Sequence, residues 1–110
     1  MGLCGIVFMT APSREEAERI ARCLVEERLA ACVQILPEIR SFYWWEGRMC
    51  DDRETLLLAK TQAELFHLLV DKVRQMHSYQ VPEIVFVPIQ DGLPEYLAWI
   101  HKETKPQSPS

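Results

Sequence analysis

The sequence predicts one small α+β domain in which the order strand, helix, strand occurs twice. Two observations support this fold class. Each half starts with a short apolar run, continues with a Ser/Thr-x-x-Glu capping box and an amphipathic helix, and returns to a second strand. The chain has 110 residues and 12.8 kDa, which is the size of one domain. We assign that domain to residues 1–104 and expect residues 105–110 to form a disordered tail.

The first half runs from residue 3 to about residue 44. Residues 3–10 form an apolar run that is predicted to be a buried strand. Ser13 and Glu16 then form the capping box of a helix whose apolar residues recur at helical spacing. Residues 31–44 follow as a strand with apolar residues on both faces, and Pro37 indicates a bulge or an unpaired edge amide there.

The second half repeats this order after a turn at Trp45-Glu46-Gly47. Residues 48–60 are predicted to return as a strand. Thr61 and Glu64 form a second capping box, which opens the second amphipathic helix. That helix is expected to end at the segment beginning with His77.

A buried strand at 84–89 and a short helix at 95–102 complete the chain. The helix is expected to bury Tyr96, Leu97, Trp99 and Ile100. Right-handed crossovers make the two strands of each half parallel. Two such units in series give the ferredoxin-like βαββαβ sandwich, in which two helices cover one face of a sheet.

The central hairpin is too long for a monomer of this size. Each arm has about 13 residues and therefore reaches about 40 Å. A domain of this length has a radius of gyration of only about 13 Å. The overhanging part carries Tyr43, Trp44 and Trp45, and exposed aromatic patches of this kind mark interfaces. We expect the hairpin to pair with neighbouring subunits in a closed ring.

Composition and charge disfavour several classes of partner. The net charge of −4 and the lack of a Lys/Arg cluster disfavour nucleic-acid binding. No apolar run is long enough to form a membrane-spanning helix, and the first residues lack the basic start of a signal peptide. We therefore expect a cytoplasmic protein with no membrane or nucleic-acid partner. The four irregularly spaced cysteines are expected to be free thiols.

Several motifs between about residues 6 and 100 resemble the CutA divalent-ion tolerance family. They are Thr10-Ala-Pro, Leu29-Ala-Ala-Cys-Val33, Tyr43-Trp-Trp-Glu-Gly47, Lys60-Thr61, His77-Ser-Tyr-Gln-Val-Pro-Glu83 and Tyr96-Leu-Ala-Trp99. The resemblance implies a homotrimer of ferredoxin-like subunits, in which strands of adjacent subunits continue each other's sheets. It also implies a role in the tolerance of copper and other divalent ions.

The sequence departs from the family pattern at a possible copper site. The family usually has His-Pro-Tyr where this chain has His77-Ser78-Tyr79, and Met9 and Met76 replace a Cys and a second His of some relatives. Met9, Met76 and His77 would form a soft ligand set suited to Cu(I), and Cys32 is a further candidate ligand. The alternative is that the methionines and Cys32 pack in the core and that His77 caps the helix C-terminus.

Lys60 and Glu83 match polar positions that recur in the family. We expect them, together with Tyr79, at a pocket between subunits. As an ion pair, Lys60 and Glu83 would be structural. If they faced a cavity, they would hold an anionic or metal ligand.

Two functional hypotheses follow. The first is a non-catalytic trimer that binds copper or another divalent metal ion. The second is a signalling or scaffold trimer, similar in shape to the PII proteins, that binds a small effector in the cleft between subunits. No order of Ser, His, Asp or Cys in the sequence indicates a nucleophile, so we expect neither catalytic residues nor an organic cofactor.

Overall fold

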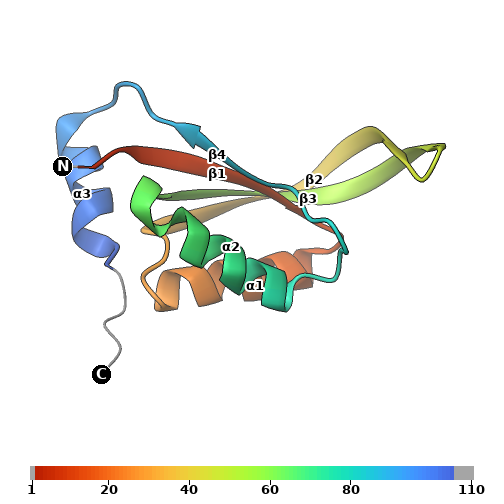
Figure 1. The fold of residues 1–110 in the computed structure, drawn as a ribbon, viewed down its shortest axis with the longest axis horizontal. Coiled ribbons are helices and arrows are strands. Elements are labelled where there is room, and N and C mark those ends of the chain that lie inside the picture. Colours follow the sequence, from red (N-terminus) through yellow and green to blue (C-terminus); the bar gives the residue numbers. More distant parts are fainter. Residues whose placement is uncertain (1, 106–110) are drawn as a thin grey trace.

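The computed structural model describes residues 2–105, so residues 106–110 of the expected tail lie outside the described residues. A four-stranded sheet with the order β2-β3-β1-β4 carries two helices on one face, and a third helix lies at one end (Figure 1). The strands are β1 (Cys4–Ala11), β2 (Cys32–Trp45), β3 (Arg48–Gln62) and β4 (Ile84–Pro88). The helices are α1 (Arg14–Glu26), α2 (Phe66–Met76) and α3 (Pro94–Glu103).

All neighbouring strands of the sheet are antiparallel. The two strands of each half therefore run in the same direction without being adjacent. This is the ferredoxin-like βαββαβ topology that the sequence predicts. None of the helices in residues 2–105 combines the length and the apolar character that a membrane-spanning helix needs.

The hydrophobic core lies between the sheet and the helix pair α1 and α2. Alternate residues of each strand point into it, as the two-residue repeat of a strand requires. The buried core includes Val7, Met9 and Ala11 of β1, Ile20 and Leu24 of α1, Leu57 and Ala59 of β3, and Leu69 and Val73 of α2.

The predicted start of α1 is confirmed. The Ser13 hydroxyl accepts a hydrogen bond from the backbone N–H of Glu16 at 3.2 Å. The reciprocal half of the capping box does not form, because the Glu16 carboxylate accepts hydrogen bonds from Ser78 instead. Glu16 therefore joins α1 to the segment that follows α2.

The second predicted capping box is wrong. β3 continues to Gln62, a 3-10 turn (Ala63–Leu65) follows, and α2 begins at Phe66 without a side-chain cap. The Thr61 hydroxyl donates to the backbone carbonyl of Leu29 at 2.6 Å. Because β3 carries Thr61 into the fully buried interior, its hydroxyl is not available to the helix.

The β2–β3 hairpin projects beyond the body of the molecule, as predicted (Figure 1). Its turn residues Glu46 and Gly47 have φ values of 50° and 77°, the left-handed pair that matches the twist of hairpin strands. The ladder shifts register between Leu36 and Ile39, which confirms the irregularity predicted at Pro37. Trp44, near the tip, is 74% exposed.

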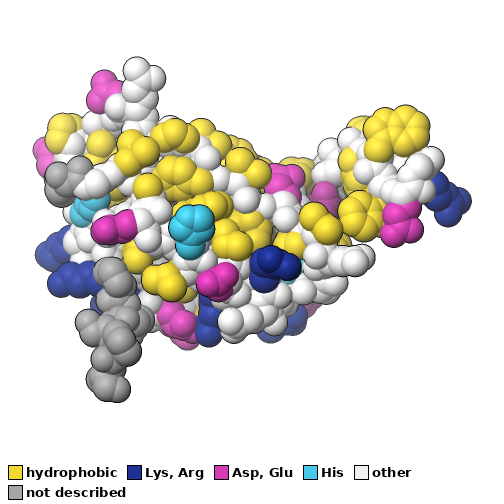
Figure 2. Space-filling view, viewed as in Figure 1, with side chains coloured by type: hydrophobic (Ala, Val, Ile, Leu, Met, Phe, Trp, Pro, Cys, Tyr) yellow, Lys and Arg dark blue, Asp and Glu magenta, His cyan; other side chains and the backbone are white. Residues whose placement is uncertain are grey.

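The sheet face opposite α1 and α2 is apolar. It carries the residues that alternate with the core positions, namely Ile6 and Phe8 of β1, Leu36 of β2, Leu56 and Leu58 of β3, and Val85 and Val87 of β4. Leu36, Val85 and Val87 are exposed. Figure 2 shows hydrophobic side chains gathered over the β1–β4 side of the sheet and on the hairpin. We call the sheet face opposite α1 and α2 the open sheet face.

Helix α3 is less buried than the sequence predicts. Ile100 is fully buried and Leu97 is half-buried, whereas Tyr96 and Trp99 are exposed. The prediction that all four would be buried is therefore wrong for the isolated chain. One copy of the sheet therefore covers only part of the apolar surface of α3. The Tyr96 and Trp99 rings contact each other with centroids 5.5 Å apart.

Candidate functional site

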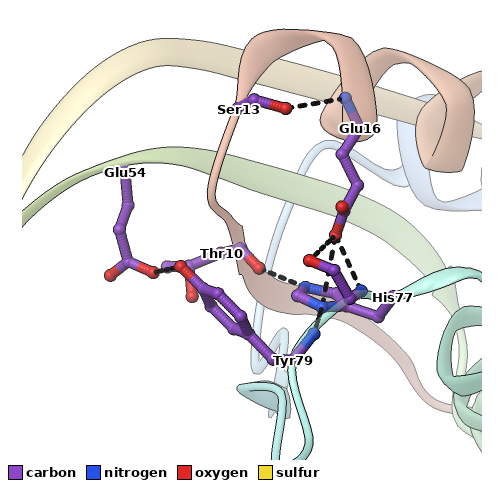
Figure 3. Close-up of polar contacts among 7 residues, drawn as sticks. Thr10, Ser13, Glu16, Glu54, His77 and Tyr79 are labelled. Carbon is purple, nitrogen blue, oxygen red and sulfur yellow. Dashed lines mark hydrogen bonds and ion pairs between the residues drawn. The ribbon is translucent and has the colours of Figure 1, made fainter.

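A polar network joins the end of β1, the start of α1 and the segment after α2 (Figure 3). The His77 side chain is fully buried. Its Nδ1 accepts a hydrogen bond from the backbone N–H of Tyr79 at 3.0 Å, and its Nε2 lies 2.7 Å from the backbone carbonyl oxygen of Thr10. These partners place the ring proton on Nε2, which donates to Thr10.

The Glu16 carboxylate anchors the same segment from the other side. Its Oε2 accepts from the backbone N–H and the hydroxyl of Ser78, each at 3.1 Å, and lies 3.3 Å from His77 Nδ1. Glu16 is buried, and a buried carboxylate needs such donors to offset its lost hydration. The His77-Ser78-Tyr79 segment is thus fixed to both α1 and β1.

Three of the four predicted metal ligands lie in this region. Met9 is 1% exposed, and Met76 packs against the same buried cluster. Met9 precedes Thr10, whose carbonyl His77 contacts. Both nitrogens of His77 are occupied, so a metal ion would bind only after Nδ1 had lost the Tyr79 N–H.

Cys32 lies apart from this network, at the start of β2. Its Sγ is 3.7 Å from the Tyr96 hydroxyl and 4.0 Å from Lys60 Nζ. All four cysteines are free thiols, as predicted. In the part of the chain that the structure describes, no three His, Cys, Asp or Glu side chains form a group that could hold a metal ion. The copper site stays a prediction.

A pocket of about 810 Å³ lies along one side of the hairpin, from Glu54 near its base to Trp45 beside its turn. We call it the hairpin-base pocket. Residues of β2, β3 and the segment after α2 line it, among them Arg40, Phe42, Tyr43, Trp45, Glu54, Tyr79 and Glu83. Of the predicted pocket residues, Tyr79 and Glu83 lie in this pocket. Lys60 lies elsewhere and contacts Gln34 and Cys32, so it forms no ion pair with Glu83.

Two carboxylates and a tyrosine determine the electrostatics of the hairpin-base pocket. The Tyr79 hydroxyl donates to Glu54 Oε2 at 2.8 Å (Figure 3). Burial raises the pKa of the Tyr79 phenol, and the hydrogen bond to Glu54 raises it further. The partial loss of hydration of the Glu83 carboxyl at the pocket rim, and then the nearby charge of Glu54, raise its pKa above the usual value. A positively charged ligand would offset the negative charges of both carboxylates.

The pocket also contains residues of the predicted trimer interface. Trp45 and Tyr43 line it, and the Tyr43 hydroxyl donates to Asp52. That hydrogen bond raises the pKa of Tyr43 to about 12. The sequence groups Glu54 with Asp51 and Asp52 in an acidic stretch, which favours a solvated face over a weak oxygen site for a divalent ion, so Glu54 is not predicted as a residue of this pocket.

Comparisons with known proteins agree with this fold. The sequence model named "CutA1 divalent ion tolerance protein" matches residues 5–103. The chain belongs to the CutA1 family. The "Divalent-cation tolerance protein CutA" of Thermus thermophilus is 50% identical over 99 residues, which are 90% of this chain and 96% of that protein.

Two further CutA proteins illustrate the range of the family. Mouse "Protein CutA" is 42% identical over 109 residues, which are 99% of this chain but only 62% of the mouse protein. A solved structure from Archaeoglobus fulgidus, titled a periplasmic divalent cation tolerance protein, has a TM-score of 0.89 at 46% identity. That match covers 93% of this chain and 99% of the solved chain. The resemblance to the CutA family that the sequence indicates is therefore confirmed.

Proposed function

We propose that the protein acts as a homotrimer in the tolerance of divalent metal ions and binds copper or another such ion. The CutA1 family match supports the role in ion tolerance. The exposure of apolar side chains on the open sheet face is the single observation that supports assembly into a trimer. Three of its side chains, Leu36, Val85 and Val87, are exposed, and a second copy offers an equally apolar surface to cover them.

The two edges of the sheet support a ring. β2 and β4 are the edge strands, and they lie on opposite sides of each copy. Pairing β2 of one copy with β4 of the next is a head-to-tail contact, which closes into a ring when the rotation permits. The hairpin then places Tyr43, Trp44 and Trp45 beside a neighbour, at the edge of the cleft between subunits in which the hairpin-base pocket lies.

Light scattering on the purified chain tests the assembly. We expect a mass of about 38 kDa, three times the 12.8 kDa of one chain. A deletion of residues 42–50 should yield monomers or aggregates, because it removes the aromatic part of the hairpin. An intact trimer after this deletion would contradict the role of the hairpin.

Copper titration tests the predicted ligands. We expect His77→Ala to weaken Cu(I) binding if His77, Met9 and Met76 act together, and Cys32→Ser to reveal any contribution of the thiol. His67→Ala is the matched control, because His67 lies on the exposed face of α2. Equal and weak Cu(I) binding by the wild type, His77→Ala and His67→Ala would exclude His77 as a ligand.

The hairpin-base pocket favours a second candidate function. We propose, as the alternative, a trimer similar in shape to the PII proteins that binds a small effector in this pocket. Its volume of about 810 Å³ is within the range of small-molecule sites. A thermal-shift screen of metabolites and nucleotides tests it, since a ligand bound only by the native state raises Tm.

Cytoplasmic location is part of the same proposal. Four free thiols are typical of a reducing compartment. Cell fractionation with an antibody against the chain tests this location, and recovery outside the cytoplasmic fraction would contradict it.

A further inference from the structure

Two carboxylates, Glu54 and Glu83, line the hairpin-base pocket and form no ion pair with any residue between 2 and 105. Glu54 Oε2 accepts from Tyr79, whereas Oε1 makes no hydrogen bond with any residue between 2 and 105. Glu83 forms neither a hydrogen bond nor an ion pair within those residues. Arg40 lines the same pocket, but two hydrogen bonds of 2.9 and 2.8 Å join its guanidinium to Asp51. The charge of Glu54 and Glu83 thus remains available to a ligand.

Aromatic rings form much of the remaining wall. β2 contributes Phe42, Tyr43 and Trp45, and the segment after α2 contributes Tyr79. The face of an aromatic ring carries partial negative charge and attracts cations. The Phe42 ring already makes such a contact, with the Arg40 guanidinium carbon 5.0 Å from its centroid. The aromatic walls and the carboxylates therefore both favour a positively charged ligand.

The composition of the pocket favours an organic cation over a metal ion. A hard metal ion such as Ca²⁺ takes six or more oxygen ligands, whereas the acidic ligands in this pocket are two carboxylates. Aromatic rings supply no ligand atoms to such an ion but contact the carbon atoms of an organic cation. The volume of about 810 Å³ also exceeds the needs of a bare ion.

We propose that the hairpin-base pocket binds an organic ammonium ion, with the nitrogen between Glu54 and Glu83 and the carbon chain against the rings of Tyr43, Trp45 and Tyr79. This proposal rests on the second candidate function and gives the chemical class of its effector. The raised pKa of the Glu83 carboxyl agrees with an acidic pair that lacks a counter-ion.

Calorimetric titration of the full-length protein tests the proposal. The probe is putrescine, a diamine, and butanediol is its uncharged analogue of equal chain length. We expect putrescine to bind at least about tenfold more tightly than butanediol, because the two chains are equal in length and only the diamine carries the ammonium charge that the carboxylates and the ring faces attract. Equal binding of the two, or no binding of putrescine, would overturn the proposal.

Matched variants locate the site. Glu83→Gln keeps the size of the side chain and removes its charge, and it should weaken putrescine binding about tenfold. Glu83 is exposed at the pocket rim, so this variant is expected to fold even if Glu54→Gln does not. Glu18→Gln, on the exposed face of α1, is the control and should bind like the wild type. Equal affinity in Glu83→Gln and Glu18→Gln would overturn the assignment.

Two measurements on the same samples separate this inference from the proposed functions. If light scattering gives the trimer mass and putrescine does not bind, the ammonium assignment fails and the assembly stands. If another small molecule raises Tm in the screen while putrescine does not bind, the effector function stands and the ammonium assignment again fails.

Discussion

The carboxylate of Glu16, in the first turn of α1, accepts two hydrogen bonds from Ser78, two residues beyond the end of α2. One comes from the backbone N–H and the other from the hydroxyl, each at 3.1 Å. The contact spans 62 residues of sequence and joins the two halves of the fold. A residue that the sequence assigns to a helix cap is therefore a tertiary link.

Replacing Glu16 should destabilise the fold more than replacing its neighbours. We expect Glu16→Ala to lower the free energy of unfolding by about 1–3 kcal/mol, because the Ser78 N–H loses its partner. Ser78→Ala removes the hydroxyl alone and should cost about 1 kcal/mol. Urea denaturation followed by circular dichroism measures both. The control Glu18→Ala should stay within about 0.5 kcal/mol, and a loss there equal to that of Glu16→Ala would contradict the link.

Thr61 should stabilise the interior rather than the start of α2. Its hydroxyl donates to the Leu29 carbonyl, so Thr61→Val should cost about 1–3 kcal/mol by removing the donor from a buried acceptor. Thr61→Ser keeps the hydroxyl and should cost less. The same denaturation assay ranks the two variants. A larger loss in Thr61→Ser than in Thr61→Val would show that the methyl group matters more than the hydrogen bond.

Gly5 should tolerate no side chain. A Cβ at this position would lie 2.2 Å from the Phe86 ring and 2.7 Å from the backbone oxygen of Val87, so β1 and β4 would have to separate. We expect Gly5→Ala to cost about 1–3 kcal/mol. Gly2→Ala is the control, because the nearest atom, on His101, is 4.0 Å away. Thermal unfolding of the two variants side by side decides the matter, and equal Tm values would disprove the close approach.

The carboxyl of Glu83 should make stability depend on pH. Its pKa in the folded chain is raised above the usual value of about 4.3, so the folded chain binds this proton more tightly than the unfolded chain does. The resulting stabilisation is complete below about pH 4 and is lost as the pH rises through the folded pKa.

Glu83→Gln cannot ionise and should therefore gain stability relative to the wild type as the pH rises from 4 to 7. Urea midpoints of both proteins across this range measure the difference. Glu18→Gln serves as the control and should show a constant difference. A constant difference for Glu83→Gln would contradict the raised pKa.

Much of the fold could be predicted because its signals are local. The Ser13 cap, the apolar repeat of α1 and the length of the hairpin are each visible within a few tens of residues. Thr61 shows the limit of such signals. Thr61 and Ser13 begin the same Ser/Thr-x-x-Glu pattern. The Thr61 hydroxyl, however, donates to the backbone carbonyl of Leu29, 32 residues away, and Thr61 stays in the strand.

The candidate site was less predictable because it depends on the pairing of distant segments. Glu54 comes beside Tyr79 only through the fold, since 25 residues separate them in sequence. Glu83 and Lys60 carry opposite charges and suggest a pair, yet β3 directs Lys60 towards Gln34. The exposure of Tyr96 and Trp99 likewise depends on what covers α3, and an apolar pattern does not specify the covering surface.

The register shift between Leu36 and Ile39 protects the edge of the sheet. β2 is an edge strand, and an unbroken edge of its length would offer a continuous row of N–H and C=O groups to any extended chain. Pro37 contributes no N–H, and a bulge bends the strand, so this row is divided into two short stretches. An added strand must match one of these stretches in register, which disfavours the unlimited stacking of copies into fibres.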